Sequence, residues 1–458
     1  MTQLSDVKLA LVKGLIGQAP DLAIQNLLTA LRADSRHDES LTVVQAMIEL
    51  EASDRRARNL AFSPVAPLCA VAGPFTGLSF PPRALTLIWQ ALKEERPDDV
   101  AAAKQMAARW GGPDCTSELF DMLCGRAAEG LRAGEGTFGA AAAAADQGGG
   151  RGSLAACLDI APVTRRALDQ MPEWLGRMTS EKAAKLRLAY RDAVAIADDA
   201  GPRFFEMLAA HLAEPWLILR VISGVMDRPG EAYVSGSELA SFGERVLADI
   251  ERRLGEVTAF KSTAGRRAAH AVAQAVHLAT IEIAELEQSF ALTPDGSWGR
   301  RLTRQKKTLA NTIEGHLKET DNAVGQALPL HTVRVGPRTQ RGVPRLSHDP
   351  EPPQVEKAMS LLIFMSEVRS SAAAGGFASA RAKALEVLEQ RLDKYVEEVL
   401  EEIRADDGVD PVRARAFLEI AAELCGLARD EKSAQIVRRR AAAAGPATKG
   451  LAETATHG

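Results

Sequence analysis

The sequence predicts an all-α fold, and three observations indicate it. Hydrophobic residues make up 46% of the chain, dominated by alanine and leucine, which are strong helix formers. Aromatic residues make up only 5%, with three tyrosines, and the β-branched runs typical of strands are scarce. Apolar side chains instead recur every three or four residues along most of the chain. We therefore expect a multi-helix array.

The 458 residues exceed what a single hydrophobic core usually holds, so we expect the chain to divide. We expect short N-terminal helices, which could form a solenoid-like stack. They lead into an antiparallel bundle of long helices and then into a separate small helical unit. The pattern leaves open whether the first two parts form one domain. The expected segments are a short-helix region (1–178), a central long-helix bundle (179–328), a Pro/Arg-rich linker (329–353), a C-terminal helical hairpin or bundle (354–445) and a disordered tail (446–458).

In the N-terminal region, the apolar spacing predicts three helices between residues 5 and 60. The charged end of the third helix, from Glu49 to Arg58, is expected to be a solvated face. Proline or glycine then follows each of the next apolar stretches, which is typical of helix ends. Those stretches predict helices near 85–95, 100–110 and 118–131.

The segment Gly201–Met226 has the densest run of large apolar side chains and is expected to be the folding centre. Apolar residues surround its helix axis, as in a helix enclosed by other helices. Pro202 and Pro215 each suit the first position of a helix, where the missing N–H needs no partner. We expect two short buried helices, packed inside the long-helix bundle or across one of its ends.

The following helices of the central bundle are expected to be long. Ser235 and Glu238 have the spacing of a capping box, and a clear helical period then runs from Leu239 to Val257. Two more helices are expected near 265–290 and 298–328. Antiparallel packing of these helices would complete the bundle.

The segment from residue 330 to residue 353 has no helical period and is the expected domain boundary. It contains five prolines, at positions 337, 344, 350, 352 and 353. Beyond it, a helix over 380–404 places apolar residues at near-heptad spacing with acids outside. This pattern favours a hairpin within the chain, because it covers only about three heptads.

Charge and cysteine content favour a cytoplasmic protein. The formal net charge is −4, so any nucleic acid or anionic lipid would need a local basic patch. The five cysteines form no metal-binding or paired motif, as expected of reduced thiols. The N-terminus does not resemble a signal peptide, and no apolar run reaches the roughly 20 residues of a membrane span. The alanine and arginine content is typical of bacteria with GC-rich genomes.

No catalytic pattern is recognisable, so catalytic residues stay unknown and we expect neither a cofactor nor a metal. The glycine-rich stretch 148–153 lacks the lysine and the preceding strand of a phosphate-binding loop. His270 and His277 are two helical turns apart, which is too far for one metal ion. Glu206 and His211 are expected to form a buried polar pair, with acid–base catalysis as the functional alternative.

Local basic segments are the strongest signal outside the expected core. If they converge in space, they would form an anion-binding patch for phosphates of nucleic acid or of a membrane surface. Aromatic residues for stacking bases are missing nearby. The predicted patch consists of Arg300, Arg301, Arg304, Lys306, Lys307, Arg334, Arg338, Arg341 and Arg345.

The sequence therefore favours a non-enzymatic cytoplasmic scaffold or adaptor that acts through protein–protein interaction with a partner it does not identify. One alternative is nucleic-acid or anionic-membrane-surface binding through the basic segments. Another is an enzyme with a dispersed active site in the central bundle, because such sites leave no local motif.

Overall fold

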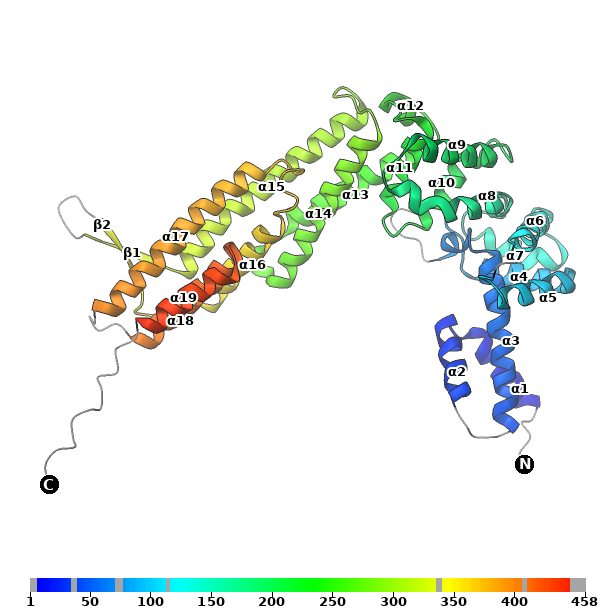
Figure 1. The fold of residues 1–458 in the computed structure, drawn as a ribbon, viewed down its shortest axis with the longest axis horizontal. Helices are drawn as coiled ribbons and strands as arrows, with labels where there is room; N and C mark the ends of the chain where they lie inside the picture. The colour runs from blue at the N-terminus through cyan, green and yellow to red at the C-terminus, as the bar shows by residue number, and fades with distance from the viewer. Residues whose placement is uncertain are drawn as a thin grey trace. The chain divides into compact units, whose positions relative to one another are not determined.

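The computed structural model describes residues 6–33, 39–70, 77–112, 116–334, 340–405 and 410–444. This described part is 78% helical, with nineteen α-helices and one small two-stranded sheet (Figure 1). The predicted all-α, multi-helix fold is confirmed. No helix among the described residues is both long and apolar enough to span a membrane.

The contacts within the chain group its residues into two compact units. Unit 1 contains residues 1–245 with 289–291, and unit 2 contains 246–288 with 292–458. This division falls inside the predicted central bundle instead of at the predicted linker. The reason is that helices before residue 245 pack on the N-terminal helices, while later helices pack on the C-terminal ones.

Unit 1 begins with three helices that share a small core. Ile16, Ile24 and Ile48 lie at its centre, one from each helix. The helices are α1 (Asp6–Gln18), α2 (Asp21–Ala33) and α3 (Glu39–Ala61). The prediction of three helices in this region is confirmed, although α3 contributes more than a solvated face at its charged end. Asp54 and Arg55 are both buried there.

Buried arginines bind the last carbonyl groups of helices in unit 1. Arg55 of α3 donates to the carbonyl oxygens of Ile16 (2.8 Å), Gly17 (3.2 Å) and Ala19 (2.6 Å) at the end of α1. Arg165 binds the end of α3 in the same way, through the carbonyls of Leu60 and Ala61 at 2.7 Å each. These carbonyls have no partner inside their own helix, so each guanidinium satisfies them and offsets the negative end of the helix dipole.

The next helices cover α3. Asp54 of α3 forms ion pairs with Lys93 of α4 (3.0 Å) and Lys104 of α5 (2.6 Å), which holds both helices against it. Helix α6 packs on α8, and α8 continues through two internal prolines. The bounds are α4 (Arg83–Glu95), α5 (Pro97–Ala108), α6 (Glu118–Ala133), α7 (Gly139–Ala145), α8 (Arg151–Leu175) and α9 (Ser180–Val194).

The predicted folding centre is a buried helix pair, α10 (Ala200–Ala210) and α11 (Ile218–Met226), joined by a short turn of 3-10 helix at Pro215–Leu217. Phe205 is fully buried and packs its ring against Tyr190, Phe204 and Phe242. The pair contacts α8 and α9 of unit 1, and Phe205 also meets Phe242 near the start of the next long helix. An apolar circumference indicates burial but does not specify the neighbours.

After α12 (Glu231–Ser235), helix α13 (Ala240–Ala259) begins in unit 1 and continues into unit 2. The predicted capping box is not used, because Ser235 ends α12. Ser237 accepts a hydrogen bond from the Leu239 backbone N–H instead, at 3.2 Å.

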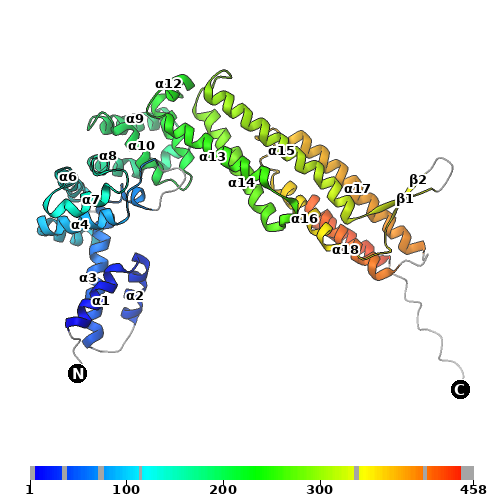
Figure 2. The same ribbon diagram turned by 180° about the vertical axis from the view of Figure 1, so that it is seen from behind.

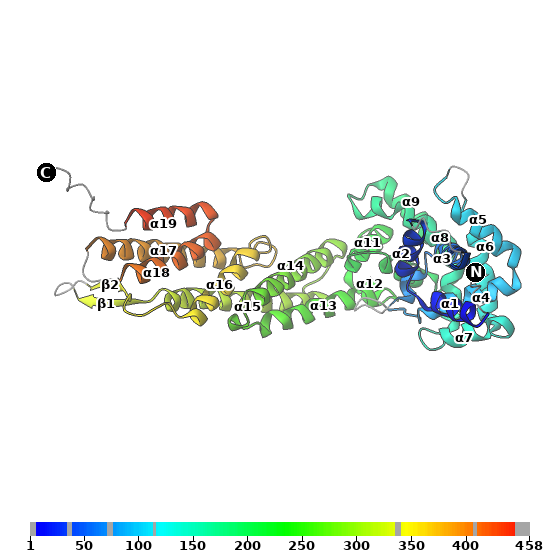
Figure 3. The same cartoon turned by 90° about the horizontal axis from the view of Figure 1, so that it is seen from below.

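Unit 2 is a bundle of long helices, in which α15 and α17 run side by side (Figures 1 and 2). Its core includes Leu309 and Ile313 of α15 and Leu392 and Val396 of α17, all buried. Figure 3 shows α17 together with α18 and α19. The bounds are α14 (Arg266–Ser289), α15 (Ser297–Ala327), α16 (Pro352–Glu367), α17 (Ala378–Ala405), α18 (Pro411–Ala428) and α19 (Glu431–Ala443).

The predicted linker contains a β-hairpin that the sequence did not suggest. Strands β1 (Leu330–Arg334) and β2 (Gln340–Pro344) pair antiparallel, with Leu330 opposite Pro344. Pro344 sits at the end of β2, where its missing N–H is tolerated. Arg341 of β2 forms ion pairs with Glu398 (2.6 Å) and Glu401 (2.5 Å) of α17. The hairpin is therefore attached to the bundle of unit 2.

Candidate functional site

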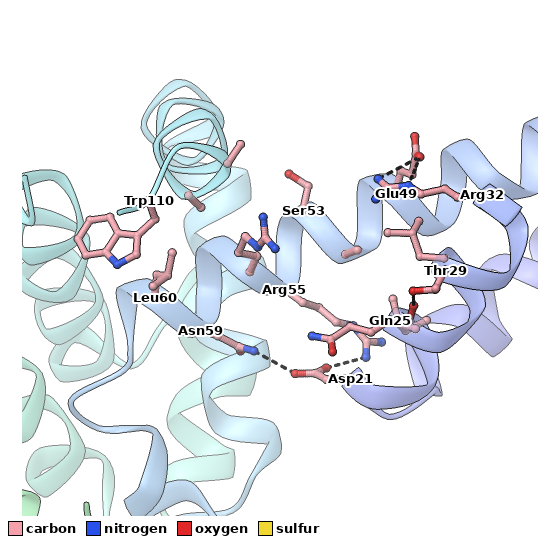
Figure 4. Close-up of a pocket in the computed structure, with 16 residues that line it drawn as sticks. Asp21, Gln25, Thr29, Arg32, Glu49, Ser53, Arg55, Asn59, Leu60 and Trp110 are labelled. Carbon is pink, nitrogen blue, oxygen red and sulfur yellow. Dashed lines mark hydrogen bonds and ion pairs between the residues drawn. The ribbon is translucent and has the colours of Figure 1, made fainter. Parts of the chain in front are cut away.

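The best candidate site is a groove of about 840 Å³ in unit 1, between α2, α3 and the end of α5 (Figure 4). It follows the face of α2 from Asp21 to Arg32, a distance of roughly 16 Å at 1.5 Å per residue. Residues three and four apart on each helix therefore line it. The lining consists of Asp21, Ile24, Gln25, Leu28, Thr29, Arg32, Glu49, Ala52, Ser53, Arg55, Arg56, Asn59, Leu60, Ala107, Ala108 and Trp110.

The floor of the groove is apolar. Ile24 is buried, and Leu28 and Ala52 pack beside it at the edge of the small core. At one end, Trp110 lies beyond the last turn of α5 and is 42% exposed. Its ring contacts buried Phe120 edge to face at 5.2 Å between centroids. Trp110 is thus held in place on one side and open on the other.

A polar network fixes the wall next to the start of α2. The Asp21 carboxylate accepts hydrogen bonds from Arg55 (2.8 Å) and Asn59 (3.0 Å) (Figure 4). Burial opposes the charge of Asp21, but the hydrogen bonds from Asn59 and Arg55 and the nearby Arg58 outweigh it. They hold its pKa below the ordinary value of 3.8. Asp21 is therefore a fixed anion with its charge already balanced.

The far end of the groove carries a second balanced pair, between Arg32 and Glu49 at 3.3 Å. Both side chains are exposed, so this pair contributes little to stability. Arg56, in contrast, is exposed and has no hydrogen-bond or ion-pair partner among the described residues. The groove therefore presents one unbalanced positive charge beside its apolar floor.

The chemistry of the groove is suited to recognition. Its two acids are occupied by arginine partners, and it contains neither a histidine nor a cysteine. In the part of the chain that the structure describes, no three His, Cys, Asp or Glu side chains are grouped to hold a metal ion. Burial raises the thiol pKa of the four described cysteines to about 12 or about 11, well above neutral; they are Cys69, Cys124, Cys157 and Cys425.

The polar pair predicted between Glu206 and His211 is not made. Glu206 receives both arms of the Arg245 guanidinium and the Gly77 backbone N–H. His211 lies at the end of α10, with its Nε2 3.2 Å from the carbonyl oxygen of Pro64. Burial lowers the pKa of His211, which favours the neutral ring. Each side chain therefore has a structural partner of its own.

His270 and His277 also lack a shared site. The Nδ1 atom of His270 lies 2.5 Å from a Glu367 carboxylate oxygen, on the exposed surface. His277 faces the Ser371 hydroxyl at 3.5 Å. The two histidines therefore contact different residues.

The described members of the predicted anion-binding patch form two groups, at opposite ends of α15. Arg300, Arg304 and Lys307 are exposed near the start of α15, without partners among the described residues. Arg341 and Arg345 follow the other end of this helix. Lys307 lies 20 residues before the end of α15 at Ala327, or roughly 30 Å along the helix axis, so the two groups do not converge on one phosphate.

Several members of the patch are already neutralised. Arg301 pairs with Glu251 at 2.9 Å, Lys306 with Glu287 at 2.8 Å, and Arg341 with two acids of α17. Arg338 and the side chain of Arg334 lie outside the described residues. Arg345 is exposed, and its backbone N–H is bonded to Pro329. The remaining charge is dispersed over unit 2.

The groove residues were not found from the sequence. The sequence was interpreted as one solvated charged face that included Arg55, Arg56 and Arg58. In the structure Arg55 is buried and Arg56 is exposed. Helix α3 turns by about 100° per residue, so neighbouring residues face different environments. The signal that was available is Trp110, a large aromatic residue at the end of a helix and next to two glycines.

Comparison with known proteins gives no relative: no protein-family model, no curated protein and no solved structure matches the chain.

Proposed function

We propose that the protein is a helical scaffold or adaptor that acts through protein–protein interaction, and that a segment of its partner docks in the groove. The observation that carries this proposal is the combination of an apolar floor with the exposed Trp110 and the unpartnered Arg56. Tryptophan and arginine are the residues most enriched among those that dominate binding energy at protein interfaces.

The groove geometry specifies the chemistry of the docking segment. A volume of about 840 Å³, extended along α2, accommodates a few side chains of one chain segment. An apolar side chain would cover the floor at Ile24 and Leu28 and contact the ring of Trp110. A carboxylate near it would balance Arg56, because Asp21 and Glu49 already neutralise the other arginines. The expected partner segment is therefore apolar with at least one acid.

Quantitative affinity purification with matched variants tests this proposal. The wild-type chain is compared with Trp110→Ala and with Arg56→Glu, and the control is Arg166→Glu. Arg166 is also exposed in unit 1 and has no partner among the described residues, but it lies on α8 and does not line the groove. Circular dichroism checks that each variant is folded.

Proteins retained by the wild-type chain and by Arg166→Glu, but lost at least tenfold with both groove variants, would support the proposal. A tenfold loss corresponds to about 1.4 kcal/mol, which is typical of removing one important contact. Identical sets of retained proteins for all four chains would contradict it.

A further inference from the structure

Helix α15 of unit 2 carries three exposed cations on one side, which we call the α15 cationic stripe. Arg300, Arg304 and Lys307 have no hydrogen-bond or ion-pair partner among the described residues. Because a helix turns by about 100° per residue, the three lie within a sector of roughly 60°, opposite the buried Leu302 and Leu309. The stripe extends over roughly 10 Å of the helix axis. It therefore presents three neighbouring charges to the solvent.

Two further cations of α15 bind the acids that reach this part of the helix. Arg301 binds Glu251 of α13 at 2.9 Å, and Lys306 binds Glu287 of α14 at 2.8 Å. The segment 296–313 contains no Asp or Glu, although the whole chain has more Asp and Glu (60) than Lys and Arg (56). The acids of the neighbouring helices are thus paired with Arg301 and Lys306, and the charge of the stripe is left unbalanced.

The surface around the stripe is polar and accessible. Ser297, Thr308 and Asn311 are exposed on the same side of α15 and supply further hydrogen-bond donors. No large apolar side chain of α15 is exposed. Figures 1 and 2 show that the first turns of α15 extend beyond α17, α18 and α19, which therefore leave this part of the helix uncovered. The surface offers donors and positive charge without an apolar component.

We propose that the α15 cationic stripe binds the phosphate backbone of double-stranded DNA. A duplex carries one negative charge per roughly 1.7 Å of its axis, so a stripe of roughly 10 Å meets several phosphates wherever it lands. The guanidinium groups of Arg300 and Arg304 suit this ligand, because each can donate two parallel hydrogen bonds to one phosphate. Backbone contacts carry no sequence information, so the binding is independent of base sequence.

The composition of this surface favours a duplex over other anionic partners. Proteins bind single-stranded nucleic acid largely by stacking bases on aromatic side chains, and Trp298 at the start of α15 is buried. A helix that lies on a membrane inserts bulky apolar residues, and α15 exposes none. A duplex keeps its bases stacked inside and presents phosphates outside, so it requires only the charges and donors that the stripe supplies.

The number of cations sets the strength of this binding and its dependence on salt. Three phosphate contacts give a slope of about −2.7 in a plot of log affinity against log salt concentration. The affinity should then fall about 40-fold between 50 and 200 mM salt. Binding is expected in the range of non-specific complexes, with a Kd of about 10⁻⁴ to 10⁻⁶ M. It is separate from the groove proposed to bind a protein segment, because the groove belongs to unit 1.

Fluorescence anisotropy of the full chain with a labelled DNA duplex of mixed sequence, titrated from about 50 to 200 mM salt, tests the proposal. The triple variant Arg300→Gln, Arg304→Gln, Lys307→Gln is expected to bind at least tenfold more weakly at the lowest salt and to lose most of the slope. If this variant does not fold, as judged by circular dichroism, the three single variants replace it. Each is then expected to reduce the slope by about one unit.

The matched control removes three other exposed cations of unit 2 that have no partner among the described residues, Lys261, Arg267 and Arg439, each changed to Gln. It alters the net charge equally and is expected to weaken binding by less than about threefold, because salt screens distant charges. No binding of the wild type at about 50 mM salt would overturn the proposal, as would equal losses in both triple variants. Stronger binding to single-stranded DNA, or binding only to phosphatidylserine vesicles, would also contradict it.

Discussion

Large apolar side chains are usually buried and charged ones exposed, and helices α1 and α14 depart from this rule in opposite ways. Helix α1 of unit 1 leaves three large apolar side chains in water. Helix α14 of unit 2 buries two acids, Glu282, with 0% exposure, and Glu285. An isolated exposed leucine costs a fold little, whereas a buried carboxylate costs several kcal/mol unless it is paired or protonated. The exposed apolar residues of α1 therefore have little effect on the stability of the fold, whereas the buried acids of α14 affect it strongly.

The buried acid of α14 belongs to a cluster with α13. Arg253 binds Asp249 at 2.7 Å and Glu282 at 3.1 Å, and Arg252 binds Asp249 from the surface. One oxygen of Glu282 has no hydrogen-bond partner among the described residues. Burial raises the pKa of Glu282 to about 8, with Asp249 adding to the effect and Arg253 opposing it. At neutral pH the Glu282 carboxyl therefore carries a proton.

The largest expected effect comes from removing the cation of this cluster. Arg253→Met leaves Asp249 as a buried anion without its inner partner, and it should cost about 3–5 kcal/mol. Arg252→Met is the matched control, because this neighbouring arginine is about half exposed and its loss should cost less than about 1 kcal/mol. Native-state hydrogen exchange of α13 and α14 at pH 7 measures both. Equal effects would mean that burial does not distinguish the two arginines.

The next effect concerns pH. The folded pKa of Glu282, about 8, is above its ordinary value of 4.5. Between these values the folded chain holds a proton that the unfolded chain releases, so stability falls as pH rises from about 4.5 to 8. The Gln side chain of Glu282→Gln cannot ionise, so it holds no proton that the unfolded chain would release. The variant should therefore be more stable than the wild type by up to roughly 5 kcal/mol above pH 8.

At pH 4.5 the same Glu282→Gln variant should differ little from the wild type, because the carboxyl is then protonated in the folded chain. Hydrogen exchange of α14, corrected for the intrinsic exchange rate at each pH, measures this difference. A gain in stability that does not depend on pH would contradict a protonated Glu282.

The smallest expected effect concerns the exposed face of helix α1. Leu11→Ala in α1 should change the stability of the monomer by less than about 0.5 kcal/mol, since the side chain is already in water. Ile16→Ala, five residues later on the buried side, should cost about 2–4 kcal/mol. Hydrogen exchange of α1 at low protein concentration compares them. A large cost for Leu11→Ala under these conditions would show that its face is covered within the monomer.

The sequence predicted where helices form more successfully than which helices meet. Pro215 divides the apolar segment into the two helices that the structure contains, because proline restricts the local backbone, whereas Pro202 is the third residue of α10 and not the first. The same residues did not indicate that the pair packs on α8 and α9. The β-hairpin was missed because the prolines and arginines of this segment are not typical of strands. Its two strands of five residues each form through pairing with each other and through contact with α17.

The candidate groove required the tertiary structure for the same reason. Ile24 lies on α2, Arg56 on α3 and Trp110 just beyond α5, and no local pattern connects them. The predicted basic patch shows the same limit. Its described residues form one group near the start of α15 and another beyond the end of this helix, and the sequence numbers alone do not give this distance.

By itself, the sequence determined the all-α class, most helix positions and the burial of the segment around Phe205. These properties follow from backbone propensity and from the period of apolar residues, which are local. Only the tertiary structure decided which charges are buried, as for Arg55 and Glu282, and which apolar residues stay in water, as for Leu11. Burial depends on neighbours from distant parts of the chain, and the spacing within one helix does not determine them.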